Sequence, residues 1–157
     1  MTLLIIFAAN YLFWVIIAIA LLKFLFAKRA TRSSLFWTAI IALPLSFLMG
    51  KIASGLFFNP RPFVIEHVQP LIPHSVSNGF PSDHTLFAST VAMIVFLHYK
   101  RTGIVLMVLT LIVGIARVLA KVHSPIDIIS GIAIAIFVVN LSVWINILIK
   151  KLYNKEG

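Results

Sequence analysis

Two histidines and an aspartate are the residues of this chain best suited to chemistry. His123 and Asp127 are four positions apart, and His84 belongs to a separate polar segment. An aspartate close to a histidine fixes the imidazole tautomer and stabilises its charged form, as in catalytic triads. His84, paired with His123, is a candidate general acid. Helix capping is the alternative for Asp127, because Ser124-x-x-Asp127 resembles a capping box, although that motif usually carries Glu or Gln.

Basic residues and helix starts beside these groups point to an anionic ligand. Arg117 and Lys121 are four positions apart, so a continuous helix would place them on one face. Arginine suits bidentate phosphate binding. Ser82 and Ser124 each precede a predicted helix start as candidate N-caps, and the free N–H groups of a helix N-terminus favour phosphate. The pattern therefore indicates phosphate chemistry.

The elements that must position these residues are apolar helices. Of the 157 residues, 61% are hydrophobic and 11% are charged, and the mean hydropathy is +1.09. A helix needs about 20 apolar residues to cross a membrane. Five stretches approach or meet that length: Leu3–Phe26, Leu35–Phe58, Ser82–Tyr99, Ile104–Val122 and Ile126–Ile149. We predict an all-α fold, a polytopic membrane bundle of about five transmembrane helices that forms a single domain over residues 1–157.

The first apolar stretch is interpreted as a membrane span. It is too long for the apolar region of a cleavable signal peptide, and basic residues follow it instead of preceding it. Small residues at positions 46, 50 and 54 of the second stretch recur every four residues. That spacing is typical of close helix packing in membranes.

The basic residues predict the orientation of the bundle. Nine of the thirteen follow or end the first, third and fifth stretches: Lys23, Lys28, Arg29, Arg32, Lys100, Arg101, Lys150, Lys151 and Lys155. Cytoplasmic loops of membrane proteins carry the excess of lysine and arginine. The N-terminus and the loop Asn59–Pro81 are therefore expected outside and the C-terminus inside. The same placement favours membrane orientation over nucleic-acid binding as the reason for the formal charge of +9.

With this topology, the polar residues gather at the outer face. The cluster comprises Lys51, Arg61, Ser82, Asp83, His84, Arg117, Lys121, His123 and Asp127. Polar groups at membrane depth are costly and usually functional. Scattered interfacial anchors are the alternative, but they do not explain two histidines and two aspartates at one face. A transporter or channel, a further alternative, predicts polar residues through the whole membrane depth.

Three segments of this cluster carry a family resemblance. They are Arg61-Pro62, Pro81-Ser82-Asp83-His84 and Arg117-x5-His123-x3-Asp127. In this order they resemble the motifs of type 2 phosphatidic acid phosphatases, which are Lys followed by Arg-Pro, then Pro-Ser-Gly-His, then Ser-Arg followed by His and Asp. Asp83 replaces the usual Gly and Ala116 the usual Ser. Ser54 occupies the usual lysine position, and Lys51 lies one turn earlier.

The resemblance is greatest to the bacterial undecaprenyl-diphosphatases of this family. It rests on the segments 60–64, 71–74 and 80–85. It implies an enzyme of the bacterial cytoplasmic (inner) membrane whose active site faces outside and whose partners are the bilayer and a lipid phosphate. Other lipid phosphates are alternative substrates, among them phosphatidylglycerophosphate, phosphatidic acid and lipid A.

The resemblance also implies a role for each site residue. His123 would attack phosphorus and form a phosphohistidine, Asp127 would orient it, and His84 would protonate the leaving oxygen. The implied phosphate-binding residues are Arg61, Arg117, Ser82, Asp83 and, as a substitute for the motif lysine, Lys51. No metal or other cofactor is expected. Glu66 and His74 of the outer loop are either headgroup contacts or plain loop residues.

Overall fold

A computed structural model of the chain describes residues 1–153, and helices dominate it. They are α1 (Thr2–Asn10), α2 (Leu12–Leu25), α3 (Arg29–Leu56), α4 (Pro62–Ile65), α5 (Asp83–Phe96), α6 (Lys100–Leu119) and α7 (Pro125–Tyr153). The described residues contain no β-strand, only an isolated antiparallel bridge between Pro60 and Asn78. The predicted all-α class is thus confirmed.

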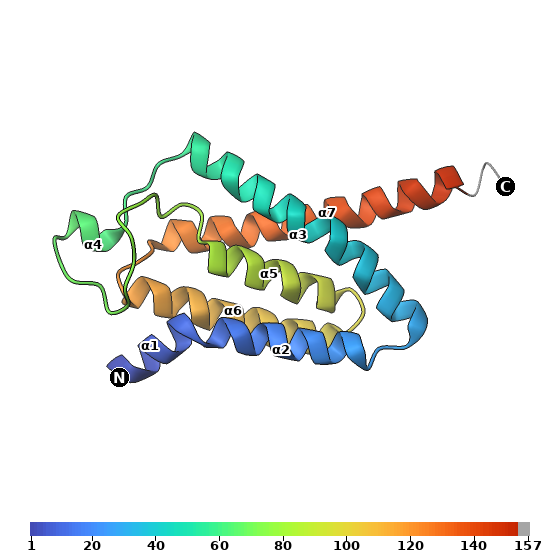
Figure 1. Cartoon of the computed structure of the whole chain (residues 1–157), viewed down its shortest axis with the longest axis horizontal. Helices are drawn as coiled ribbons and strands as arrows, with labels where there is room; N and C mark the ends of the chain where they lie inside the picture. Colours follow the sequence, from blue (N-terminus) through green and yellow to red (C-terminus); the bar gives the residue numbers. More distant parts are fainter. Residues whose placement is uncertain (154–157) are drawn as a thin grey trace.

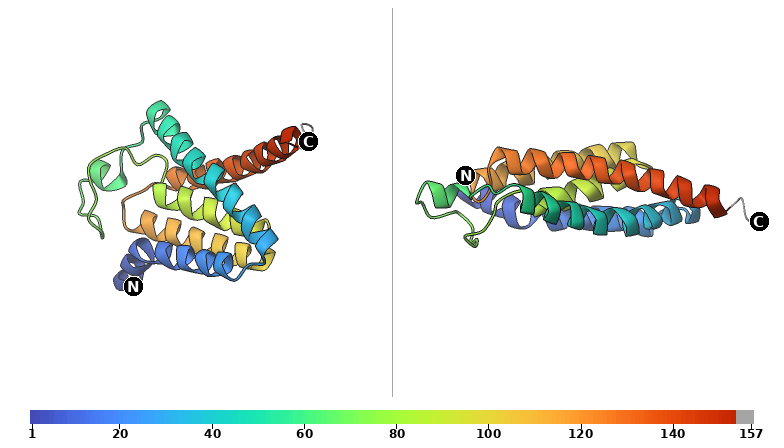
Figure 2. Two further views of the ribbon diagram at one scale, coloured as in Figure 1. Left: turned by 45° about the vertical axis from the view of Figure 1, so that its right-hand side comes forward. Right: turned by 90° about the horizontal axis from the view of Figure 1, so that it is seen from above.

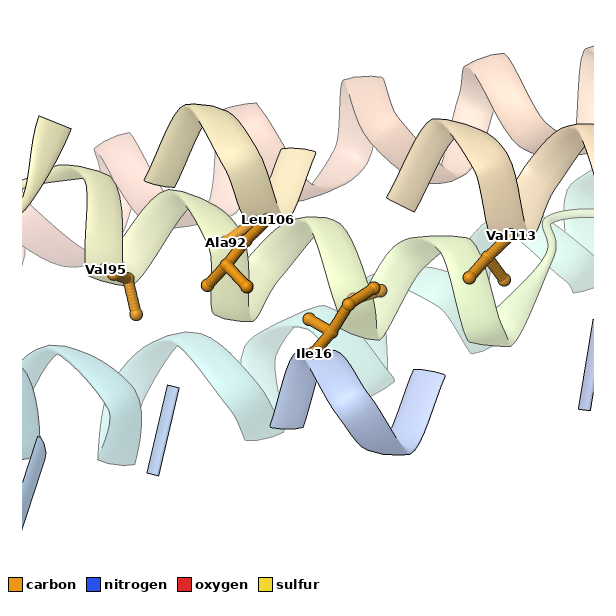
Figure 3. Close-up of a cluster of buried hydrophobic side chains, with 6 residues drawn as sticks. Ile16, Ala92, Val95, Leu106 and Val113 are labelled. Atoms are coloured by element: carbon orange, nitrogen blue, oxygen red, sulfur yellow. The ribbon is translucent and has the colours of Figure 1, made fainter. Parts of the chain in front are cut away.

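Helix α5 is the centre of the bundle. It packs against α2, α3, α6 and α7, which surround it (Figure 1). Figure 3 shows the core on one side, where Ile16 of α2 meets Ala92 and Val95 of α5 and Leu106 and Val113 of α6. Many residues of α5 are small, and small side chains let membrane helices approach closely.

Helices α3 and α5 touch through the small residues predicted from the sequence. Ser46 and Gly50 are both fully or nearly fully buried, and the Ser46 Oγ lies 2.9 Å from Thr90 Oγ1. A Cβ added to Gly50 would lie 2.8 Å from a side-chain carbon of Leu86. The predicted close packing of this helix is confirmed.

The lengths of the helices only partly match the five predicted spans. Three described helices, α3, α6 and α7, are long and apolar enough to cross a membrane. Helix α5 has 14 residues, fewer than the roughly 20 of a full span. Helices α1 and α2 qualify only together, as a pair bent by 44°.

The predicted span Leu3–Phe26 is therefore a bent pair of helices and not one straight helix. The chain breaks at Tyr11, and Arg117 Nη1 donates a 3.1 Å hydrogen bond to the Ala9 carbonyl beside the break. A side chain that enters the backbone ladder of a helix is a known cause of a kink. Because Arg117 lies 108 positions from Ala9 in the sequence, no local sequence pattern predicts the break.

The two ends of the bundle differ in what they carry. The N-terminus, α4 and the starts of α5 and α7 lie at one end in the views of Figures 1 and 2. The α2–α3 and α5–α6 connections and the end of α7 lie at the other. We call these the loop end and the basal end.

Candidate active site

A pocket of about 290 Å³ opens at the loop end. Its lining includes six of the residues predicted for the site: Lys51, Arg61, Asp83, His84, Arg117 and His123. They come from α3, α5, α6, the loop between α3 and α5, and the turn between α6 and α7. The remaining two predicted residues, Ser82 and Asp127, are fully buried beside it. The fold therefore gathers residues that are far apart in the sequence.

The ring of His123 is held through its Nδ1 atom. This atom lies 2.9 Å from the Gly79 carbonyl oxygen and 3.3 Å from Asp127 Oδ2. Because both oxygens accept hydrogen bonds, Nδ1 carries the proton and Nε2 is the unprotonated nitrogen. Nε2 accepts a long hydrogen bond of 3.4 Å from Arg61 Nη1. Burial lowers the pKa of His123, opposed by its hydrogen bond to Asp127, so the neutral, nucleophilic form is favoured.

Asp127 contacts the His123 ring and also caps the start of α7, the two alternatives that its position in the sequence allowed. Its Oδ2 also accepts a 2.8 Å hydrogen bond from the backbone N–H of Ser124, as a capping residue would. Its Oδ1 accepts a 2.8 Å hydrogen bond from Asn59 Nδ2. The same amide donates to Ser124 Oγ at 2.7 Å. The carboxylate thus fixes the start of α7 and the His123 ring together.

The two arginines are fixed by backbone carbonyls. Arg61 donates from Nη1 to the Val122 carbonyl at 2.7 Å and from Nη2 to the Asn78 carbonyl at 3.2 Å. Arg117 uses Nη1 for the Ala9 carbonyl. In both residues the buried Nε–H has no hydrogen-bond partner. Such donors are costly to leave unpaired.

His74 is drawn from the loop into the pocket. Its Nε2 lies 3.0 Å from Arg117 Nη2, and because an arginine only donates, His74 accepts and is neutral. Its ring centroid lies 6.0 Å from that of His123, nearly perpendicular to it. Burial, and then the charges of Arg61, Arg117 and His123, lower the pKa of His74 to about 4. This placement favours ligand contact over a plain loop role.

Glu66 and Lys121 instead pair with each other on the surface. Lys121 Nζ lies 2.9 Å from Glu66 Oε2. The predicted common face of Arg117 and Lys121 is wrong, because α6 ends at Leu119 and Lys121 has a φ of 63°. Neither Glu66 nor Lys121 lines the pocket.

Lys51 lines the pocket, but its side chain is exposed and its head group lies along α3 toward Phe47. Its Nζ lies 5.3 Å from the ring centroid of Phe47, one turn earlier in α3. Side chains of a helix lean toward its N-terminus, which here leads away from the loop end. Ser54, at the usual lysine position, accepts a hydrogen bond of 3.1 Å from Asn78 Nδ2 instead.

The start of α5 presents His84 and Asp83 to the pocket. His84 is half-buried, and its ring centroid lies 5.3 Å from that of Phe13. Ser82 occupies the N-cap position, but its hydroxyl accepts a 3.2 Å hydrogen bond from Thr85 and caps no backbone N–H. The backbone N–H of Ser82 donates to the Asp127 carbonyl, so Ser82 joins the starts of α5 and α7.

Sequence reasoning missed Asn59, Asn78 and Gly79. Asn78 Oδ1 accepts hydrogen bonds from the backbone N–H groups of Asn59 and Phe80, and its Nδ2 donates to the Phe57 carbonyl. It thereby pins both ends of the loop. The Asn-Gly pair is a turn signal in any sequence, but it does not reveal that the Gly79 carbonyl contacts the ring of His123.

The family model of the PAP2 superfamily matches residues 35–150. The chain therefore belongs to the PAP2 superfamily, and with its long apolar helices it is a multi-pass membrane protein.

Individual relatives agree with this membership. The chain is 33% identical over 126 residues to the bacitracin transport permease protein BcrC of Bacillus licheniformis, covering 80% of this chain and 62% of that protein. It is 28% identical over 128 residues to the undecaprenyl-diphosphatase BcrC of Bacillus subtilis, covering 80% and 66%. The chain thus spans less than two thirds of the length of each. The crystal structure of Aquifex aeolicus LpxE superposes with a TM-score of 0.69 at 26% identity, covering 90% of this chain and 86% of that one.

Proposed function

We propose that this protein hydrolyses a lipid diphosphate, undecaprenyl diphosphate, to the lipid monophosphate and inorganic phosphate. The observation that carries the proposal is the arrangement around His123: an unprotonated imidazole nitrogen beside an arginine, in a pocket that a second arginine also lines. A nucleophile with a positioned orienting group and flanking cations is what phosphoryl transfer requires. The name of the Bacillus subtilis relative supports the choice of substrate.

The reaction has two steps. His123 Nε2 attacks the terminal phosphorus, forming a P–N bond while the bond to the bridging oxygen breaks, and His84 gives that oxygen a proton. Asp127 and the Gly79 carbonyl stabilise the positive charge that grows on the ring of His123. Water then attacks the phosphohistidine, His84 accepts a proton from it, and phosphate leaves.

The phosphoryl oxygens bind to donors that the fold has already oriented. Arg61 and Arg117 supply guanidinium N–H groups, and the first turn of α5 supplies backbone N–H groups at Asp83 and His84. Each well-placed donor of this kind contributes on the order of 3 kcal/mol to transition-state stabilisation. Lys51 is a secondary ligand, because its Nζ lies over Phe47.

An apolar groove supports a lipid substrate. It has a volume of about 340 Å³ and lies between α2, α3 and α5. Phe13 lines it and touches the ring of His84. A polyprenyl tail in this groove would leave its diphosphate at the pocket, with the bridging oxygen on the His84 side.

The proposal includes the placement in the membrane. The five apolar stretches form one domain of five membrane crossings in the bacterial cytoplasmic membrane, with the loop end outside. Although one relative is named as a transport permease, an apolar cluster around Ile16, Ala92 and Leu106 fills the bundle below the site, which favours hydrolysis over transport.

The test measures phosphate release by the purified full chain after exhaustive chelation. The panel holds undecaprenyl diphosphate, undecaprenyl phosphate, phosphatidic acid, phosphatidylglycerophosphate and lipid A, and the first is expected to react fastest. Quenching with alkaline detergent and labelled substrate should trap a phosphoenzyme that His123→Ala lacks, because the P–N bond of a phosphohistidine survives alkali and is cleaved by acid. The control is His67→Asn, a loop histidine outside the pocket whose φ of 53° asparagine tolerates. If another lipid were turned over fastest, that lipid would be assigned as the substrate instead. A normal phosphoenzyme level in His123→Ala would show that His123 is not the nucleophile.

A further inference from the structure

A second polar opening lies at the basal end, opposite the active site. Helices α3 and α7 cross and then diverge toward this end (Figures 1 and 2). Between them is a crevice of about 370 Å³, which Leu97 and His98 of the α5–α6 connection also line. We call it the basal crevice, and its polar and aromatic lining residues are Ser33, Ser34, Trp37, Thr38, His98 and Asn146.

The basal crevice has the composition of a headgroup site. Its hydroxyl, imidazole and amide groups come from three separate elements, and His98 Nε2 lies 3.0 Å from Ser34 Oγ across the gap between two of them. Its remaining walls include Val143 and Ile147. Hydrogen-bonding groups are costly beside lipid, so a crevice that combines them with apolar walls fits a ligand with a polar head and an acyl chain.

The charges at this end select the sign of the ligand. The three acidic residues of the described part of the chain, Glu66, Asp83 and Asp127, all lie at the loop end. The basal end carries basic residues at the starts of α3 and α6: Arg29, Arg32, Lys100 and Arg101. Arg29 lies one helical turn before Ser33 of the crevice, on the same face of α3.

We propose that the basal crevice binds the headgroup of an anionic phospholipid from the leaflet at this end. Ser33, Ser34 and Asn146 donate hydrogen bonds to the phosphate oxygens, and Arg29 and Arg32 supply the attraction for a net negative headgroup. Trp37 has the amphipathic ring typical of the membrane interface. The site shares no residue with the pocket at the loop end, so it stands whether or not the proposed hydrolysis is correct.

Native mass spectrometry of the purified full chain tests this proposal. With equal amounts of phosphatidylglycerol and phosphatidylcholine in neutral detergent, we expect phosphatidylglycerol to be retained in roughly tenfold excess, because basic residues attract anionic lipid. Filling the crevice with Ser34→Leu and Asn146→Leu together should abolish the excess. The matched control is Asn140→Leu, which removes an exposed amide from the same helix α7 outside the crevice and should retain it.

A second variant keeps the test decisive if the crevice variant fails to fold. Arg29→Gln with Arg32→Gln leaves the crevice open and removes two positive charges from the start of α3, close in sequence to Ser33, and it should reduce the excess of phosphatidylglycerol severalfold. Thermal melting in detergent establishes that each variant is folded. Equal retention of the two lipids by the wild type, or an unchanged excess in the folded variants, would overturn the proposal.

Discussion

At the scale of single residues, His123 is positioned by two acceptors, of which only one is a side chain. Replacing Asp127 by Asn leaves the Gly79 carbonyl, 2.9 Å from Nδ1, to hold the ring. The tautomer therefore survives, but the charge that stabilises the developing imidazolium is lost. We expect kcat of Asp127→Asn to fall on the order of 10²-fold, less than the roughly 10⁴-fold loss of a triad whose histidine also adopts the wrong tautomer.

The same variant should change the pH profile in a defined direction. His123 attacks only when unprotonated, so activity is present above its pKa and is lost as the pH falls through it. Burial lowers this pKa and Asp127 opposes the effect. Asp127→Asn removes the opposition, and the acid limb of kcat/KM should move to lower pH. An unmoved limb, or one at higher pH, would contradict the assignment.

His74 gives a third prediction at this scale, since its Nε2 accepts a hydrogen bond from Arg117 Nη2. His74→Leu removes the acceptor, whereas His74→Gln keeps one. A hydrogen bond to a charged group contributes about 1.5–3 kcal/mol, so we expect KM of the leucine variant to rise at least about tenfold, with kcat changed less. Glutamine should restore most of the loss. If the two variants were equally impaired, with His67→Asn normal, the ring of His74 itself and not its acceptor would be what the site needs.

Whether a residue of the site could be predicted depends on how far away in the sequence its contact partners lie. His84, His123 and Asp127 could be predicted because short motifs fix their spacing, and the two resulting helix starts were also predictable. The contacts of Asn59 with Asp127 and of Ala9 with Arg117 span 68 and 108 positions. Such contacts depend on how the helices assemble, which a single sequence does not encode locally.

At the scale of elements, the bundle depends on a close crossing of α5 and α6 at the basal end. A Cβ added to Gly103 would lie 2.4 Å from the Cα of Phe96, a backbone atom that cannot move aside. Gly55, near the end of α3, has no atom within 4 Å of the same position. Forced overpacking costs about 1–3 kcal/mol, often more against backbone. Gly103→Ala should therefore lower the melting temperature clearly and Gly55→Ala should not.

Melting of both variants in one detergent provides the comparison. Alanine favours a helix over glycine by about 1 kcal/mol. Gly55→Ala should therefore gain stability, and any loss of stability in Gly103→Ala must come from the crossing of α5 and α6. Equal melting temperatures would show that α6 shifts freely against α5. The apolar stretches predicted these helices from composition, whereas their crossing distances follow from which small residues face each other.

At the scale of the whole molecule, the basic residues at the starts of α3 and α6 and the pocket lie at opposite ends of the bundle. The N-terminus and the start of α5, whose Asp83 and His84 line the pocket, lie at one end, while the starts of α3 and α6, which carry basic residues, lie at the other. The excess of lysine and arginine marks the cytoplasmic side of a membrane protein. Undecaprenyl diphosphate would then meet the pocket at the outer surface, and the basal crevice would face the inner leaflet.

This orientation can be tested because the chain contains no cysteine. Ser75 is exposed in the loop beside the pocket, and Thr31 is partly exposed at the start of α3. In intact cells a membrane-impermeant maleimide should label Ser75→Cys at once and Thr31→Cys only after permeabilisation. Both variants leave every lysine and arginine in place, so the charge bias that sets the orientation is retained. The reverse pattern would place the pocket in the cytoplasm, and labelling of both positions in intact cells would indicate two orientations in one membrane.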